Sequence, residues 1–280
     1  MADKIVLIDE AKPVTVEELK ALQVRRASAR RNFLKNVGLA SAGIAAGALI
    51  EGCSDSKKVM AAGPSEADVL NFALNLEYLE AEFYSIAVNG VRLSASISGG
   101  TSTATGGSQV TFTDPLVAAV AADIVVDEAN HVAYLRTALG AAAVAEPVIN
   151  LAALGIGFAS QAEFLTLSRA LEDTGVSAYA GAATLLTGNN LQAAAQILAT
   201  EAYHAGNIRF NIVQKGIVVP ALDSQDVIPD MTHFFTTDAN SLAIKRTTSQ
   251  VLAIVYGNAT VGTSSGGFYP NGLNGTIKTV

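Results

Sequence analysis

The chain has 280 residues, of which 50% are apolar and 15% are charged, so it can bury a large core and is not a disordered protein. Its formal net charge of −7 argues against a nucleic-acid partner. A single cysteine excludes an internal disulfide framework and a cysteine-based metal cluster, and no uncharged apolar run is long enough to span a bilayer.

Residues 1–52 are predicted to be an export signal that lies outside the fold. The basic pair Arg30 and Arg31 precedes a weakly hydrophobic run rich in Ala and Gly, Val37–Ile50. This arrangement resembles a twin-arginine signal, except that Ala29 stands where Ser or Thr is common. A buried core helix is the alternative interpretation of the run, but its glycines disfavour a helix interior.

The only cysteine follows directly. The sequence from Ile50 to Cys53 resembles a bacterial lipoprotein cleavage box in which Glu51 is unusual. Cys53 is therefore expected to carry a lipid anchor, and the alternative is an unpaired thiol after simple cleavage. We expect the twin-arginine export machinery as a partner and a periplasmic or cell-surface location. Residues 53–64 are polar and predict a tether.

Four long helices are predicted in a bundle over residues 65–216. Their expected ranges are 65–89, 114–139, 160–187 and 190–215. Each start carries a capping residue, and these are Ser65, Asp114 before Pro115, Ser160 in a capping box with Glu163, and Asn190.

The connections between these helices differ in character. Residues 91–113 are rich in Gly, Ser and Thr and predict a long loop or a small hairpin. The stretch 140–159 lacks clear periodicity and predicts a long crossover. Residues 217–280 are expected to form a C-terminal extension packed on the bundle, with one short helix around Ser241–Tyr256. The predicted fold class is therefore all-α, a four-helix bundle with a long central crossover.

Two of the helices place Glu and His on the stripe that should be buried. Glu128 and His131 lie three residues apart on the second helix, and Glu201 and His204 repeat this spacing on the fourth. Burying such groups without partners costs on the order of several kcal/mol each, whereas a metal ion turns this cost into binding. Carboxylates with imidazoles suit iron or manganese. Core polar groups that are hydrogen-bonded without metal are the alternative.

A di-metal site needs one further carboxylate from each remaining helix. Glu77 on the first helix and Glu172 on the third can supply it, and Glu80 is a supplementary or alternative ligand. Tyr84 and Tyr179 follow Glu77 and Glu172 by seven residues, so the two halves of the bundle form a quasi-repeat. Each tyrosine either packs in the core or orients a ligand carboxylate.

Two further ionisable residues are interpreted as lying outside this site. Glu82 points away from the stripe that carries Glu77 and is expected to be solvated. His233 lies in a loop between Pro229 and Phe234 and is expected to be structural.

The pattern resembles the ferritin-like superfamily of di-iron carboxylate proteins. More narrowly, NFALNLEYLEAEFY, DEANHVAYL, ALEDTGVSAYAG, ATEAYHAGNIRFN and the tail sequences TTSQVLAIVYGN and GGFYPNGLNG resemble ferritin-like domain proteins linked to desiccation or stress. The resemblance covers residues 65–280 and implies two Fe ions, with Mn or a mixed Fe/Mn pair as alternatives. It implies six metal ligands, which are Glu77, Glu128, His131, Glu172, Glu201 and His204.

Three functions remain open from the sequence. The first is a redox enzyme of ferroxidase, peroxidase or catalase type, the second is iron handling, and the third is a structural stress protein in which the metal only stabilises the bundle. An access channel favours the enzyme, a hollow multimer favours storage, and a sealed site favours the structural role. A homo-oligomer through helix faces is also expected.

The long crossover makes a geometric prediction. It can run the length of the bundle, so the first and third helices are expected to be antiparallel around the metals. The family resemblance favours a hydrogen bond from Tyr84 to Glu172, and the quasi-repeat suggests a matching bond from Tyr179 to Glu77.

Overall fold

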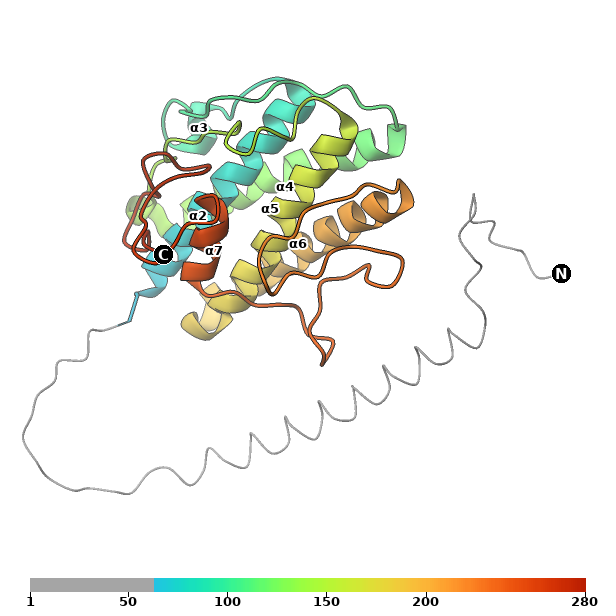
Figure 1. The fold of residues 1–280 in the computed structure, drawn as a ribbon. Coiled ribbons are helices and arrows are strands. Elements are labelled where there is room, and N and C mark those ends of the chain that lie inside the picture. The colour runs from blue at the N-terminus through green and yellow to red at the C-terminus, as the bar shows by residue number, and fades with distance from the viewer. Residues whose placement is uncertain (1–62) are drawn as a thin grey trace, which may run out of the picture. The chain divides into compact units, whose positions relative to one another are not determined.

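The computed structural model describes residues 63–280, so the predicted export signal, Cys53 and nearly all of the predicted tether lie outside the described residues. Four long helices lie side by side in the described part (Figure 1) and are α2 (Glu66–Tyr84), α4 (Pro115–Leu139), α5 (Gln161–Ala182) and α6 (Gly188–Gln214). The helix α2 packs mainly on α4, and α5 packs mainly on α6. The all-α prediction is confirmed.

The starts of three helices follow from their capping residues. Ser65 and Asp68 form a reciprocal capping box at α2, and Asp114 caps α4 directly before its proline. Ser160 caps α5, but the Glu163 carboxylate accepts hydrogen bonds from the preceding loop at Gly157 and Ala159 instead of closing a capping box. Local cap chemistry therefore fixes where each of these helices begins.

The start of α6 differs from the predicted one. The helix begins at Gly188 after Thr187, whereas Asn190 was expected to be its cap. The side chains of Thr187 and Asn190 both donate to the carboxylate of Glu66 at the beginning of α2. A tertiary contact therefore holds the side chain of Asn190, which the sequence pattern assigned to capping.

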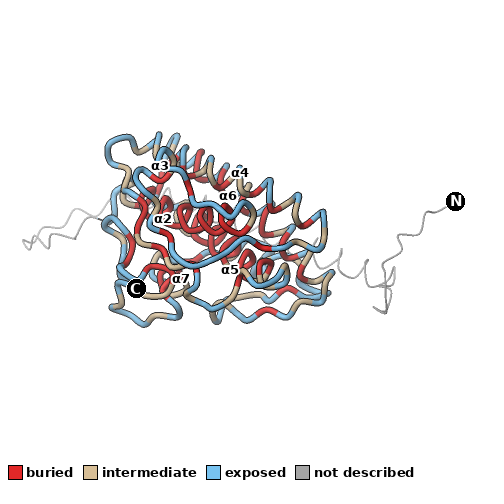
Figure 2. Tube along the Cα trace, turned by 90° about the horizontal axis from the view of Figure 1, so that it is seen from above, coloured by how far each residue is buried: buried red, intermediate tan, exposed pale blue. Residues whose placement is uncertain are grey.

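The helix α2 is the central element of the bundle. Residues on every side of it are buried, whereas buried and exposed residues alternate along α4 and α6 (Figure 2). It continues into a π-helical turn, Ser85–Asn89, and ends at Gly90, whose φ of 71° suits glycine. A helix buried on all sides needs partners beyond the other three long helices, and the connections supply them.

The insert at residues 91–113 packs against the crossover. It contains a one-turn helix, α3 (Ala95–Ser98), and no hairpin, so the hairpin alternative is wrong. Thr105 forms a parallel bridge with Asn150 in the crossover, through main-chain hydrogen bonds of 2.8 Å to Ile149 and from Leu151. The two connections thus hold each other over α2.

The C-terminal segment is tied to the bundle by buried ion pairs. Arg169 on α5 contacts Asp226, and Arg209 on α6 contacts Asp173 on α5 at 2.7 Å while donating to main-chain carbonyls of the extension. All three arginines that are fully buried in the described part, Arg169, Arg209 and Arg246, serve this junction.

The short C-terminal helix is α7 (Thr248–Val255), which begins later than the predicted 241 because Thr247 and Gln250 form its capping box. Beyond it, the tail returns to the middle of α2. The Tyr269 hydroxyl donates to the Asn75 carbonyl at 2.7 Å, and the side chain of Asn75 exchanges hydrogen bonds with the main chain of Asn274. Among the described residues, no helix has the length and apolar character needed to cross a membrane.

Candidate metal centre

The structure brings all six predicted ligand residues to one level in the centre of the bundle. Each of the four long helices contributes a carboxylate that is fully buried, and α4 and α6 each add a histidine one turn further on. The residues are Glu77, Glu128, His131, Glu172, Glu201 and His204.

These side chains form two overlapping groups of four. One group joins Glu77 and His131 to the shared pair Glu128 and Glu201, and the other joins Glu172 and His204 to the same pair. Within each group, one donor atom from every residue lies within 4.8 Å of the others. The shared carboxylates come from α4 and α6, and the unshared ones come from α2 and α5.

The histidines point one nitrogen into these groups. Nδ1 of His131 lies 3.2 Å from Glu77 Oε2 and 3.3 Å from both Glu128 Oε2 and Glu201 Oε1. Nδ1 of His204 lies 3.0 Å from Glu128 Oε1 and 3.3 Å from Glu172 Oε2. The two imidazole rings are 6.4 Å apart between centroids. Both groups of four therefore have the same composition, three carboxylates and one imidazole.

The donor atoms of the cluster fit a metal ion. At least one oxygen of each of the four carboxylates, and Nδ1 of His204, is buried without a well-oriented hydrogen-bond partner. Unsatisfied lone pairs at this depth are costly, and a cation between them removes the cost. Three carboxylates with one imidazole are a donor set that suits iron or manganese.

The pKa values of the metal-free cluster also indicate that it needs positive charge. Burial raises the pKa of Glu201 well above its usual range, and it raises the pKa of Glu128 to about 7 despite hydrogen bonds from both histidines. Burial would also lower the pKa values of the imidazoles, but the surrounding carboxylates outweigh it and raise both. Without metal, the cluster therefore holds protons where a metal would place positive charge.

The two predicted tyrosine contacts are confirmed. The hydroxyl of Tyr84 on α2 donates to Glu172 Oε1 on α5, and that of Tyr179 on α5 donates to Glu77 Oε1 on α2. These reciprocal bonds show that α2 and α5 run antiparallel across the cluster. Burial and the adjacent carboxylates raise the pKa of both phenols well above the usual value, so both remain protonated donors.

Glu80 lies beside the cluster but outside both groups of four. It is buried, and burial together with neighbouring carboxylates, Glu201 first, raises its pKa well above the usual range. A Cβ atom on Gly175 of α5 would lie 2.6 Å from Glu201 Oε2 and 3.1 Å from Glu80 Oε1. The glycine in this helix interior therefore leaves the space that both carboxylates occupy.

One contact to the cluster has no counterpart in the quasi-repeat. Nε2 of His204 lies 3.2 Å from Asp127 Oδ2, an interaction that fixes the orientation of the ring whose Nδ1 faces the cluster. The equivalent position before Glu201 is Thr200, whose hydroxyl donates to its own helix at Gln196. The sequence pattern revealed neither Asp127 nor Gly175, because their roles depend on which helices meet.

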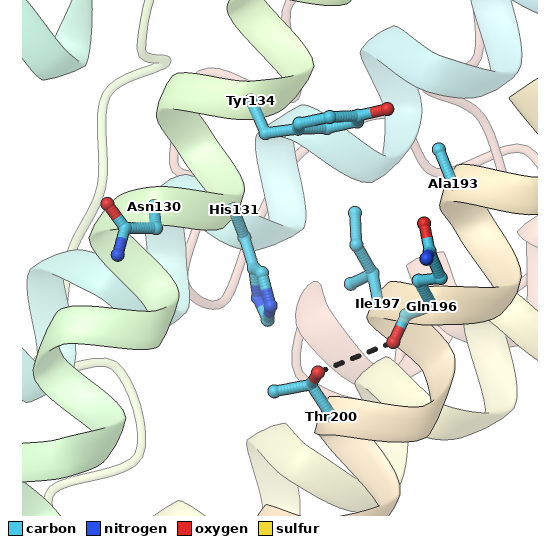
Figure 3. Close-up of a pocket in the computed structure, with 7 residues that line it drawn as sticks. All are labelled: Asn130, His131, Tyr134, Ala193, Gln196, Ile197 and Thr200. Carbon is cyan, nitrogen blue, oxygen red and sulfur yellow. Dashed lines mark hydrogen bonds between the residues drawn. The ribbon is translucent and has the colours of Figure 1, made fainter.

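A pocket opens onto one side of the cluster. It has a volume of about 300 Å³ and lies between α4 and α6, where His131 and Tyr134 project toward residues of α6 (Figure 3). The His131 side chain is 11% exposed and is the member of the cluster that lines this pocket. The pocket is lined by Asn130, His131, Tyr134, Ala193, Gln196, Ile197 and Thr200.

The four-helix fold and its buried Glu/His cluster define a ferritin-like protein whose cluster could hold a metal. Comparison with family models agrees, because the ferritin-like domain model matches residues 65–214. The chain belongs to the ferritin-like domain family. A comparison with curated proteins finds no significant match.

Proposed function

We propose that this protein binds a pair of iron ions, with manganese as the alternative, and uses them for redox chemistry with dioxygen or peroxide. The observation that carries the proposal is the pocket at His131, because it gives a small molecule a route to a ligand of the cluster. A metal that served only to stabilise the bundle would not need such a route. A bound metal pair would supply electrons and activate an O–O bond.

Different residues of the cluster would hold the two ions. Glu77 and His131 would hold one ion, Glu172 and His204 would hold the other, and Glu128 and Glu201 would be shared. The phenols of the two tyrosines each bond one oxygen of an unshared carboxylate and so restrict how that carboxylate can turn.

The pocket lining favours a neutral substrate. Apart from His131, the lining side chains are neutral, and they present one phenol, two amides, one hydroxyl and apolar groups. Carboxylates at the mouth would attract Fe²⁺ by electrostatic steering, but none lines the pocket. This entrance therefore suits dioxygen, hydrogen peroxide or a small neutral organic molecule better than it suits Fe²⁺ ions that enter for storage.

The test combines metal analysis with an assay for oxygen and peroxide consumption. Purified protein loaded with iron or manganese is expected to hold about two metal ions per chain and to consume one of the two oxidants. Ala193→Leu should fill the pocket and lower consumption without lowering metal content. Ala199→Leu, at an exposed position of α6 outside the pocket, is the matched control. Full metal loading with no consumption of either oxidant would contradict the proposed redox chemistry and favour the stabilising role.

We also propose that the protein is exported and acts in stress protection outside the cytoplasm. The support is the sequence alone, namely the twin-arginine-like signal, Cys53 and the resemblance to stress-related ferritin-like proteins. Arg30→Lys with Arg31→Lys is expected to retain the unprocessed protein in the cytoplasm, measured by cell fractionation. Normal export of the double variant would contradict this route, and Cys53→Ala tests lipid anchoring separately.

A further inference from the structure

A second pair of buried carboxylates lies outside the metal cluster. Glu82 on α2 is fully buried, contrary to the expectation that it is solvated, and Glu146 in the crossover is 8% exposed. Glu82 is two residues beyond Glu80, which places it on a different face of α2 from the stripe that serves the metal cluster. The proposed redox function uses neither residue.

Three segments meet at this pair. Glu82 Oε1 accepts the Leu93 N–H at 3.2 Å, and Glu146 Oε1 accepts the Thr103 N–H at 3.1 Å and the Ser102 hydroxyl at 3.3 Å. Leu93, Ser102 and Thr103 all belong to the insert. The pair therefore joins α2, the insert and the crossover.

The remaining oxygens of the pair have nothing to bind in the protein. Oε2 of Glu82 and Oε2 of Glu146 are both buried without a hydrogen-bond donor. The two carboxyl groups are close neighbours, because the charge of Glu82 raises the pKa of Glu146, and the Ser102 hydroxyl that donates to Glu146 also lowers the pKa of Glu82. Two carboxylates and a hydroxyl thus converge on one buried point.

Such a pair needs a positive charge or a proton between its oxygens. Burial, and then the charge of Glu82, raises the pKa of Glu146 to about 7, so near neutral pH the proton is only weakly held. The charge of Arg92 favours ionised Glu82, but burial outweighs it, and Arg92 is itself exposed. A buried carboxylate pair without full compensation is strongly unfavourable.

We infer that Glu82, Glu146 and Ser102 form a separate binding site for a hard divalent cation, with Ca²⁺ as its preferred ion. The donor set contains only oxygen, which selects a hard cation over the transition metals that imidazole favours. Ca²⁺ fits better than Mg²⁺ because it accepts carboxylates in one- or two-oxygen contact and in irregular geometry, whereas Mg²⁺ demands near-ideal octahedral geometry; bound Ca²⁺ would complete its shell with water or main-chain oxygens. Bound Ca²⁺ would clamp the insert and the crossover onto α2.

The experiment measures thermal unfolding of the full chain after chelator treatment, with CaCl₂ or MgCl₂ added back at about pH 7.5. With the weak affinity of about 0.1 to 1 mM that is common for extracellular calcium sites, 10 mM Ca²⁺ should raise the Tm by about 3 to 8 °C. Mg²⁺ should raise it less. Elemental analysis of Ca²⁺-equilibrated protein should find calcium in the preparation.

Three variants locate the effect. Glu146→Gln should abolish the Tm response to Ca²⁺, and Ser102→Ala should weaken it by about tenfold in affinity while keeping the fold. Glu128→Gln, which alters the Glu/His cluster, should retain the response and so shows that the ion does not act there. Asp123→Asn is the control for an exposed carboxylate.

A shared proton is the competing explanation, and it gives a different result. In that case Ca²⁺ would not change the Tm of the wild type, and Glu146→Gln would be more stable than the wild type at pH 8 because it removes the carboxylate that must lose its proton. A Ca²⁺ response that survives Glu146→Gln and Ser102→Ala would likewise overturn the site.

Discussion

Glu128 and Glu201 each belong to both groups of four, so a change at either one affects both metal positions. Glu201→Gln keeps the volume of the side chain and removes its charge. We expect metal content to fall below one ion per chain, and we expect the metal-free form to become more stable because a neutral amide, unlike the Glu201 carboxyl, needs no proton in order to be buried. Elemental analysis and thermal unfolding with and without metal measure the two effects. The same substitution at an exposed site, Asp123→Asn, should change neither.

The pH dependence of stability should differ between the metal-free and the metal-loaded protein. A group whose pKa is raised in the folded state adds stability at low pH, which is lost as the pH rises through the folded value. The pKa of Glu128, raised to about 7, and the raised pKa values of Glu201 and the histidines all act in this direction. The lowered pKa of Glu77 acts only in more acidic solution.

We therefore expect the Tm of the metal-free protein to fall between about pH 6 and pH 8.5. The gain in Tm on adding metal should grow over the same interval, because metal and protons compete for the same donor atoms. Paired thermal melts across this range measure both. A gain that is constant with pH would show that metal binding displaces no protons, and it would place the metal outside the cluster.

At the level of single helices, Gly175 is the position where the backbone of α5 leaves room for the cluster. Gly175→Ala would place its methyl group 2.6 Å from Glu201 Oε2, so we expect the shared carboxylate to move and metal content to fall. Gly206→Ala on α6 is the matched control, since its nearest neighbour would be Phe235 at 3.7 Å. The control should keep its metal and gain up to about 1 kcal/mol of stability from its better helix propensity.

Helix starts were predictable where the information is local. Ser65, Asp114 and Ser160 cap the helices that the sequence assigns to them, because an N-cap needs only a side-chain oxygen near its own first turn. The start of α6 was not predictable in this way, because the Asn190 side chain binds Glu66 on another helix. The start of α7 depends on which of several polar residues forms the capping box.

The same difference between local patterns and contacts between elements explains which site residues were predictable from the sequence. The Glu-x-x-His spacing and the quasi-repeat predicted the six residues that converge, because both are properties of a single helix face. Burial of Glu82 was not predictable, because it depends on the insert and the crossover closing over α2. Asp127 and Gly175 likewise acquire their roles only through contacts between helices. That the six residues bind metal stays a prediction.

At the scale of the molecule, stability should depend on the buried arginine junction. The Asp226 side chain is fully buried against Arg169, so Asp226→Ala leaves two buried guanidinium groups, those of Arg169 and Arg209, sharing the single carboxylate of Asp173. We expect a loss of about 3 to 5 kcal/mol in the free energy of unfolding, measured by denaturant titration. Ser224→Ala, at an exposed position in the same segment, should change it by less than about 0.5 kcal/mol. A small effect of Asp226→Ala would mean that the C-terminal segment contributes little to the stability of the bundle.

The contacts between the C-terminal tail and α2 can form only late in synthesis of the chain. Asn75 belongs to the first long helix of the described residues, yet its hydrogen-bond partners, Tyr269 and Asn274, follow it by 194 and 199 residues. While the ribosome is still adding residues, the nascent chain cannot finish covering this helix, and its polar groups at Asn75 must remain hydrated or find other partners. The native bundle is therefore completed only after residues 269–274 have been synthesised, and the nascent chain must remain free of aggregation until they have emerged.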